Sequence, residues 1–129
     1  MLEIDGELVT QMEPEKREHL DLWKKNISAY DYSLVVDAIN RYVDSLGVKN
    51  IIAAAIPKEN WDRPEFKALT DTCEKVKNVF PEASIAKNKP GTFFGAIFFE
   101  VIMKRKDALW SGCKIYRPFS MMYKKIKEL

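Results

Sequence analysis

Apolar residues recur at helical spacing through three stretches of the chain. Between Pro14 and Ser28, Leu20, Trp23 and Ile27 fall on one helical face, and proline suits a first helical turn. Over residues 34–46 the apolar positions step i, i+1, i+4, i+5 and onward, and a glycine at 47 is a typical C-terminal cap. A third pattern starts with an aspartate cap at 62 and a proline at 64 and continues to residue 80. The spacing predicts helices at 14–28, 34–46 and 62–80.

Two apolar segments fit more than one secondary structure. Residues 48–56 have the length of a buried strand, while three consecutive alanines favour a short helix. The most apolar run, 92–103, is rich in Phe, Ile and Val, which favours a strand. As a helix it would align Thr92, Ala96, Glu100 and Lys104 in one small or polar stripe, with Glu100 and Lys104 in the favourable i, i+4 order. That pair favours the helical interpretation.

The two ends of the chain carry shorter signals. Asp5-Gly6 lies between two apolar triplets, which indicates either a tight hairpin or a loosely ordered leader over residues 1–12. Residues 107–117 are either a connector or a strand. Pro118 then opens a pattern that predicts a last helix, with an apolar face made of Phe119, Met122, Tyr123, Ile126 and Leu129.

These elements predict a single globular domain over residues 1–129. The expected fold class is mainly α, a compact bundle of five or six helices with the run 92–103 at its centre. The alternative is an α+β fold with a small sheet made from residues 50–56, 93–103 and 109–116.

Composition excludes several classes of protein. The 129 residues are 47% hydrophobic, and no basic-then-apolar signal peptide opens the chain. The longest apolar run is too short to span a membrane as a helix. Cys73 and Cys113 lack metal-like spacing, so we expect two free thiols in a cytoplasmic protein that does not contact membranes. A single disulfide between them is the alternative.

No recognised catalytic motif is present. His19 has no nucleophile or carboxylate at a motif spacing, the five glycines form no phosphate loop, and the ligands of a zinc site are missing. Glu100 is the one unusual acid, because it lies inside the most apolar run. If buried, it would be a candidate acid or base with a raised pKa. We expect instead that it lies on the polar stripe and pairs with Lys104 at the surface. We expect no enzyme and no cofactor.

Charge is distributed unevenly along the chain. Residues 1–86 carry 11 Lys and Arg against 16 Asp and Glu, whereas residues 87–129 carry 10 against 3. This basic third predicts an acidic partner, either nucleic acid or an acidic protein surface. Its candidate binding residues are Lys104, Arg105, Lys106, Lys114, Arg117, Lys124, Lys125 and Lys127, with Trp110 and Tyr116 as the aromatic side chains that could stack on bases. Alternatively, the basic residues neutralise the acidic part of the same fold or of a second subunit in a homo-oligomer.

One segment resembles a known family. Leu20-Asp21-Leu22-Trp23, then Tyr30-Asp31-Tyr32, then Val35, Val36, Ala38, Tyr42 and Val43 resemble the helix pair that opens small phage proteins that load or inhibit the replicative helicase. The resemblance is confined to residues 20–46. It implies an all-helical domain and a protein partner, and it transfers no catalytic residue.

The combined signals favour a non-enzymatic binding module that acts on a nucleic-acid or replication-type complex through its basic C-terminal third. The alternative is a protein–protein adaptor, inhibitor or self-associating subunit that does not bind nucleic acid. A small enzyme or ligand-binding protein that uses Glu100 ranks third.

Overall fold

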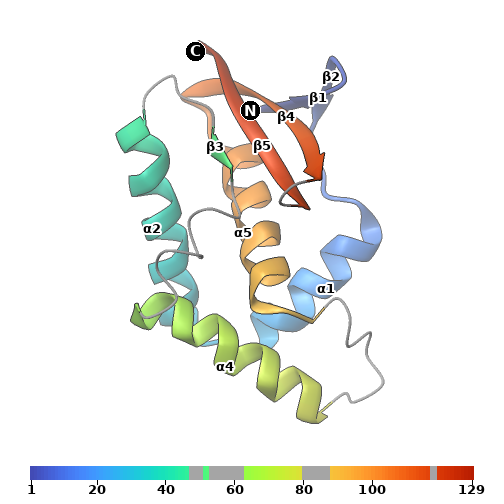
Figure 1. Cartoon of the computed structure of the whole chain (residues 1–129), viewed down its shortest axis with the longest axis vertical. Coiled ribbons are helices and arrows are strands. Elements are labelled where there is room, and N and C mark those ends of the chain that lie inside the picture. The colour runs from blue at the N-terminus through green and yellow to red at the C-terminus, as the bar shows by residue number, and fades with distance from the viewer. Residues whose placement is uncertain (47–50, 53–62, 80–87, 117–118) are drawn as a thin grey trace.

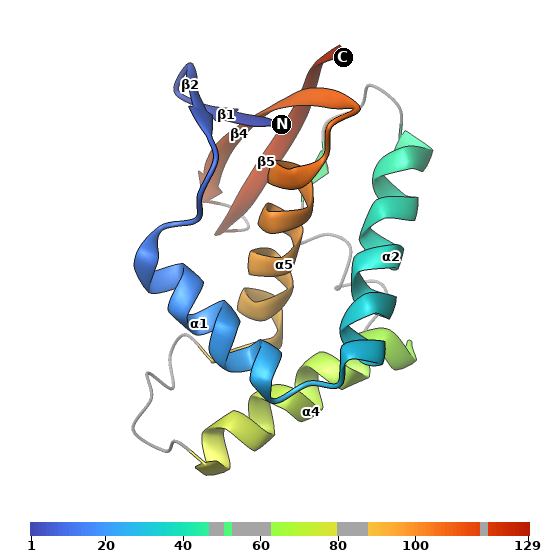
Figure 2. The same cartoon turned by 180° about the vertical axis from the view of Figure 1, so that it is seen from behind.

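The computed structural model describes residues 1–46, 51–52, 63–79, 88–116 and 119–129. Its helices are α1 (Pro14–Lys25), α2 (Ala29–Leu46), α4 (Pro64–Val79) and α5 (Pro90–Lys104). Its strands are β1 (Leu2–Ile4), β2 (Glu7–Val9), β3 (Ile51–Ile52), β4 (Ala108–Tyr116) and β5 (Phe119–Glu128). One sheet lies against the C-terminal half of α5, and α1, α2 and α4 surround the rest of that helix (Figures 1 and 2).

Three of the four described helices begin at a proline. Pro14, Pro64 and Pro90 occupy the first positions of α1, α4 and α5, where the fixed φ fits and the missing N–H is not needed. The helices predicted at 14–28, 34–46 and 62–80 are confirmed within the described residues, although α1 ends earlier than expected, at Lys25, and α2 begins earlier, at Ala29. The predicted caps at residues 47 and 62 lie outside the described residues.

The sheet has the strand order β2-β1-β4-β5-β3. Its centre is the long antiparallel hairpin of β4 and β5, which runs from the Ala108–Glu128 pair to the Tyr116–Phe119 pair. β1 pairs with β4 in parallel and with β2 in an antiparallel hairpin, whose Asp5-Gly6 turn has positive φ at both residues. β3 pairs with β5 through Ile51 and Ile52. The sheet is therefore mixed, and it joins both ends of the chain.

Aromatic side chains of α5 form the centre of the core. Phe93 stacks on Trp23 of α1 with ring centroids 4.8 Å apart, and Phe98 stacks on Tyr123 of β5 at 5.3 Å. Phe94 meets Phe66 of α4 at 5.4 Å. Such contacts add to the free energy gained by burying the rings. α5 thus connects every layer of the fold, and the helical interpretation of the run 92–103 is confirmed.

The predicted bundle of five or six helices is wrong. The structure is α+β, and the last predicted helix is strand β5. The reason is tertiary: β4 offers its hydrogen-bonding edge immediately before residue 119, and pairing along the whole hairpin outweighs the helical spacing of residues 119–129. The alternative sheet was right about residues 51–52 and 109–116 and wrong about 93–103, and its residues 50 and 53–56 lie outside the described residues. The all-helical architecture that the phage-family resemblance implied is likewise not found.

Candidate functional site

Glu100 lies on the side of α5 that faces α1, and three basic side chains surround its carboxylate. Arg17 Nη2 is 2.7 Å from Oε2, whereas Lys24 Nζ and Lys104 Nζ are 3.1 Å and 3.3 Å from Oε1. The side chain of Glu100 is only 8% exposed. Both of its oxygens are therefore paired, although the residue lies in the most apolar segment of the chain.

The surroundings of Glu100 keep it ionised. Burial alone would raise the pKa of its carboxyl group, but hydrogen bonds from Lys24 and Arg17, together with the charges of Lys24 and Lys104, lower the pKa below its ordinary value. A carboxylate in this state at neutral pH is no proton donor. The arrangement instead fastens α1 to α5 with ionic hydrogen bonds.

Lys24 also connects the cluster to α2. Its ammonium group lies 5.0 Å from the ring centroid of Tyr32, in a cation–π contact. Burial, with a further contribution from the charge of Glu100, raises the pKa of the Tyr32 hydroxyl well above its ordinary range.

The expected pair of Glu100 with Lys104 is present, but the expectation that the Glu100 carboxylate lies at the surface is wrong. Sequence reasoning missed Arg17 and Lys24, whose spacing of seven residues was the available signal that they share one face of α1.

The basic residues of the C-terminal third fall into two groups in the structure. Arg105 makes its contacts within the fold. Its guanidinium lies 2.7 Å from Asp107 Oδ2 and 2.5 Å from Asp44 Oδ1. It also donates a hydrogen bond of 2.9 Å to Asn40 Oδ1. Lys125 pairs with Glu128 at 2.9 Å, with a side chain only 13% exposed. With Lys104 held by Glu100, three of the eight candidates act within the fold.

Four of the other five basic candidates remain accessible. They are exposed and make no ion pair with any described residue: Lys106, Lys114, Lys124 and Lys127. Arg117 lies outside the described residues. Trp110 is only 1% exposed, so its ring cannot stack on a nucleic-acid base. The side chain of Tyr116 is not among those described.

The two faces of the sheet differ in what covers them. Alternation along the strands puts Trp110 and Tyr123 on one face, where both are buried against the helices. We call the opposite side the outer face. Among the described elements no helix lies against it, and it is turned toward the viewer in Figure 1. By register it carries Glu3, Leu8, Leu109, Ser111, Cys113, Ile115, Met122, Lys124 and Lys127.

The outer face mixes charge with apolar surface. Lys124 and Lys127 are exposed, and Leu8 is 53% exposed. Leu109, Ile115 and Met122 are half-buried, so part of each aliphatic side chain remains in contact with water. A β-sheet face that is solvated and partly apolar is a common site of protein association. This face is the strongest candidate for a binding surface on the described part of the chain.

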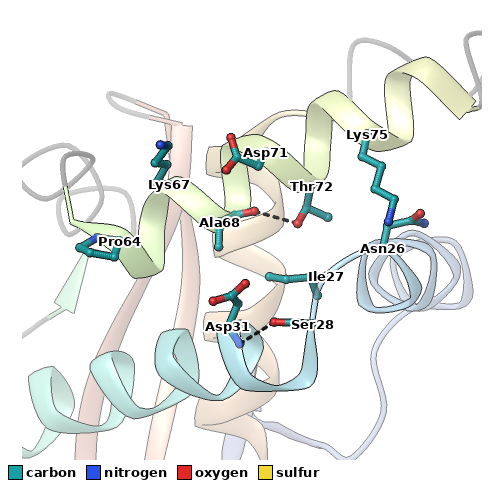
Figure 3. Close-up of a pocket in the computed structure, with 10 residues that line it drawn as sticks. All are labelled: Asn26, Ile27, Ser28, Asp31, Pro64, Lys67, Ala68, Asp71, Thr72 and Lys75. Atoms are coloured by element: carbon teal, nitrogen blue, oxygen red, sulfur yellow. Dashed lines mark hydrogen bonds between the residues drawn. The ribbon is translucent and has the colours of Figure 1, made fainter.

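A shallow groove of about 320 Å³ lies between α4 and the turn that joins α1 to α2. Figure 3 shows Lys75 of α4 reaching toward Asn26, and the hydroxyl groups of Ser28 and Thr72 occupied by backbone partners. Asp31 and Asp71 balance Lys67 and Lys75 along its walls. The two acidic and two basic side chains that line the groove therefore leave it with no net charge.

The remaining histidine and cysteine side chains among the described residues form no recognisable site. No group of three His, Cys, Asp or Glu side chains comes together there as metal ligands could. His19 is half-buried, and its ring meets the edge of Trp23 at 5.9 Å. Cys73 and Cys113 are both free, and burial raises the pKa of the Cys73 thiol to about 12. None of the described helices combines the length and hydropathy needed to cross a membrane.

Comparison of the chain with protein-family models, with curated proteins and with solved structures found no match. The charges and exposed side chains of the described residues therefore carry the functional interpretation.

Proposed function

We propose that the protein is a non-enzymatic binding module that docks an acidic protein surface on the outer face of its sheet. The observation that carries this proposal is the position of Lys124 and Lys127. Both are exposed, both make no ion pair within the described residues, and both lie beside the half-exposed aliphatic side chains of Leu109 and Met122. Their charge is therefore available to a partner.

The composition of the outer face favours a protein over a nucleic acid. Single-stranded nucleic acids are bound by exposed aromatic rings together with basic side chains. Trp110 and Tyr123 are buried, so they supply no such platform. Protein interfaces, in contrast, combine an apolar centre with a charged rim. Leu109, Ile115 and Met122 beside the lysines fit that pattern, and the resemblance of residues 20–46 also implies a protein partner.

The compartment proposed for this module is the cytoplasm. Cys73 and Cys113 are both free, and Cys113 is exposed. Exposed free thiols persist in a reducing compartment and are oxidised in secreted proteins.

A charge-reversal experiment tests the proposed surface. The probe is a peptide that alternates glutamate and leucine, and the variant is Lys124→Glu/Lys127→Glu. We expect the wild-type protein to bind the peptide, with an affinity that falls as salt is added, and the variant to lose that binding. The matched control is Lys67→Glu/Lys77→Glu, which changes the net charge by the same amount on exposed positions of α4.

The same titration with a single-stranded oligothymidylate separates the two partner classes. Binding of the oligonucleotide with a steep salt dependence, together with no binding of the peptide, would replace the proposed function with nucleic-acid binding. Equal loss of peptide binding in both double variants would show that net charge, and not the outer face, attracts the peptide.

A further inference from the structure

The outer face carries one row of side chains with opposite charges on either side of its central strand. Glu3 of β1 lies beside Ser111 of β4, and Ser111 lies beside Lys124 of β5. Leu8 of β2 continues the row beyond Glu3. Because adjacent strands are spaced evenly, at about 4.8 Å, Glu3 and Lys124 are nearly equidistant from Ser111. The row is acidic on one side of β4 and basic on the other.

We propose that the partner that docks here is the outer face of a second copy of the chain, whose Glu3 supplies the acidic group that Lys124 meets. This inference rests on the proposed function, because it names the partner of the same surface. A two-fold axis that runs parallel to β4, midway between the two sheets and over Ser111, reverses the strand order of the second copy. Glu3 of each copy then faces Lys124 of the other. The interface is self-complementary, as a two-fold dimer requires.

Charge selects this axis over the other face-to-face arrangement. A two-fold axis that runs across the strands, along the row itself, would place every residue of the row over its own copy. Lys124 would then oppose Lys124, and Glu3 would oppose Glu3. Like charges placed opposite each other disfavour a complex strongly. The axis along β4 is therefore the one that the side chains support.

The side chains of β4 suit a position on the axis. Ser111 and Cys113 both point to the outer face and both are small, so two sheets can approach to the usual separation of about 10 Å. Leu109 of β4 and Met122 of β5 supply half-exposed apolar surface next to them. Cys113 also lies near the axis, so the thiols of the two copies come close together in the dimer.

The size of the face predicts a weak dimer. Strands of nine and ten residues are roughly 30 Å long, and the row of four strands is only about 15 Å wide. The area that such a face buries is below the roughly 800 Å² per partner of a standard interface. We expect association at micromolar or higher concentrations and stronger association at low salt.

Sedimentation equilibrium at low salt tests the dimer with a charge swap. Lys124→Glu alone and Glu3→Lys alone each create two like-charge contacts, so each should raise the dimer dissociation constant by about tenfold or more. The double variant Glu3→Lys/Lys124→Glu should restore the dimer. An equimolar mixture of the two single variants should form a heterodimer, because both cross pairs are then attractive. Glu74→Lys, an exposed change on α4, is the control and should leave the dimer intact.

Cross-linking through Cys113 gives a measurement that needs no change in charge. A short bismaleimide should join two wild-type chains, and Cys113→Ser should abolish the product because Cys73 is buried.

A protein that stays monomeric at every concentration at low salt overturns the dimer. So does a charge swap that fails to restore association in both the double variant and the mixture. If such a monomer still binds the glutamate–leucine peptide through Lys124 and Lys127, the proposed function stands without the dimer.

Discussion

Arg17 of α1 donates a hydrogen bond of 2.7 Å to the buried carboxylate of Glu100 on α5. The two residues are 83 positions apart, and Lys24 adds a second contact from the same helix. A buried carboxylate is stable only when its charge and its lone pairs are satisfied. This pair therefore fixes how α1 lies against the central helix, and it accounts for the one acidic residue in the most apolar segment.

Glu100→Gln should destabilise the fold by about 1–3 kcal/mol. The amide keeps the shape of the side chain but leaves Arg17 and Lys24 without an anion at a buried position. Both cations are about one-third exposed, so water offsets part of the loss. Urea denaturation measures the change. Lys104→Gln is the control: its side chain is 67% exposed and two cations remain, so the expected loss is under about 1 kcal/mol. An equal loss in both variants would contradict the assigned role of Glu100.

The same carboxylate should make stability depend on acid pH. The pKa of Glu100 is lowered in the folded protein from an ordinary value of 4.5. Its contribution to the free energy of unfolding is therefore fully present above pH 4.5 and is lost as the pH falls through the folded pKa. We expect the stability difference between wild type and Glu100→Gln to be constant near neutrality and to shrink below pH 4.5. A difference that stays constant down to acid unfolding would contradict this linkage.

Arg105 should be needed for stability and not for binding. Its guanidinium contacts Asp107 after α5 and Asp44 on α2, so Arg105→Ala removes several hydrogen bonds from a side chain that is only 14% exposed. The expected loss is about 1–3 kcal/mol in thermal or urea unfolding. Arg105→Lys should recover only part of it, because an ammonium group lacks the planar fork that contacts both partners. The neighbouring exposed residue gives the control, since Lys106→Ala should change stability by less than about 0.5 kcal/mol.

Two glycines should respond to alanine in opposite ways. A Cβ atom at Gly112 of β4 would lie 3.1 Å from Met121 Cε and 3.3 Å from Leu2 Cδ1. Both neighbours would have to shift, so Gly112→Ala should destabilise the fold by about 1 kcal/mol. A Cβ atom at Gly95 meets no atom within 4 Å, and the residue lies inside α5. Gly95→Ala should therefore stabilise the protein by about 0.5–1 kcal/mol. An unfolding midpoint that does not fall for Gly112→Ala would contradict the close packing at Gly112, and one that falls for Gly95→Ala would contradict the open space at Gly95.

Local pattern predicted most of the helices correctly. The apolar spacing of α1, α2 and α4, and the prolines that begin α1, α4 and α5, are properties of neighbouring residues, so they can be recognised without the rest of the fold. The i, i+4 relation of Glu100 and Lys104 was sufficient to favour a helix for α5. Glycine after aspartate likewise marked the turn of the β1–β2 hairpin.

The candidate binding surface could not be predicted from the sequence. Proximity along the chain groups eight basic residues as one candidate surface, because sequence alone does not show which of them share a face. In the structure, Lys104, Arg105 and Lys125 form ion pairs with nearby carboxylates. Lys124 and Lys127 are instead exposed on the outer face. Adjacent lysines 124 and 125 differ because successive residues of a strand point to opposite faces. That distinction exists only once β5 is known to be a strand.

The sequence by itself thus determined the helices α1, α2 and α4 and the uneven distribution of charge, and it indicated the turn of the first hairpin. Only the tertiary structure decided that residues 119–128 pair with β4 as a strand, that Glu100 is buried against Arg17 and Lys24, and which lysines remain free for a partner. The physical reason is the range of the interactions. Helical periodicity and proline geometry act within a few residues, whereas strand pairing and burial of a charge depend on groups brought together from distant parts of the chain.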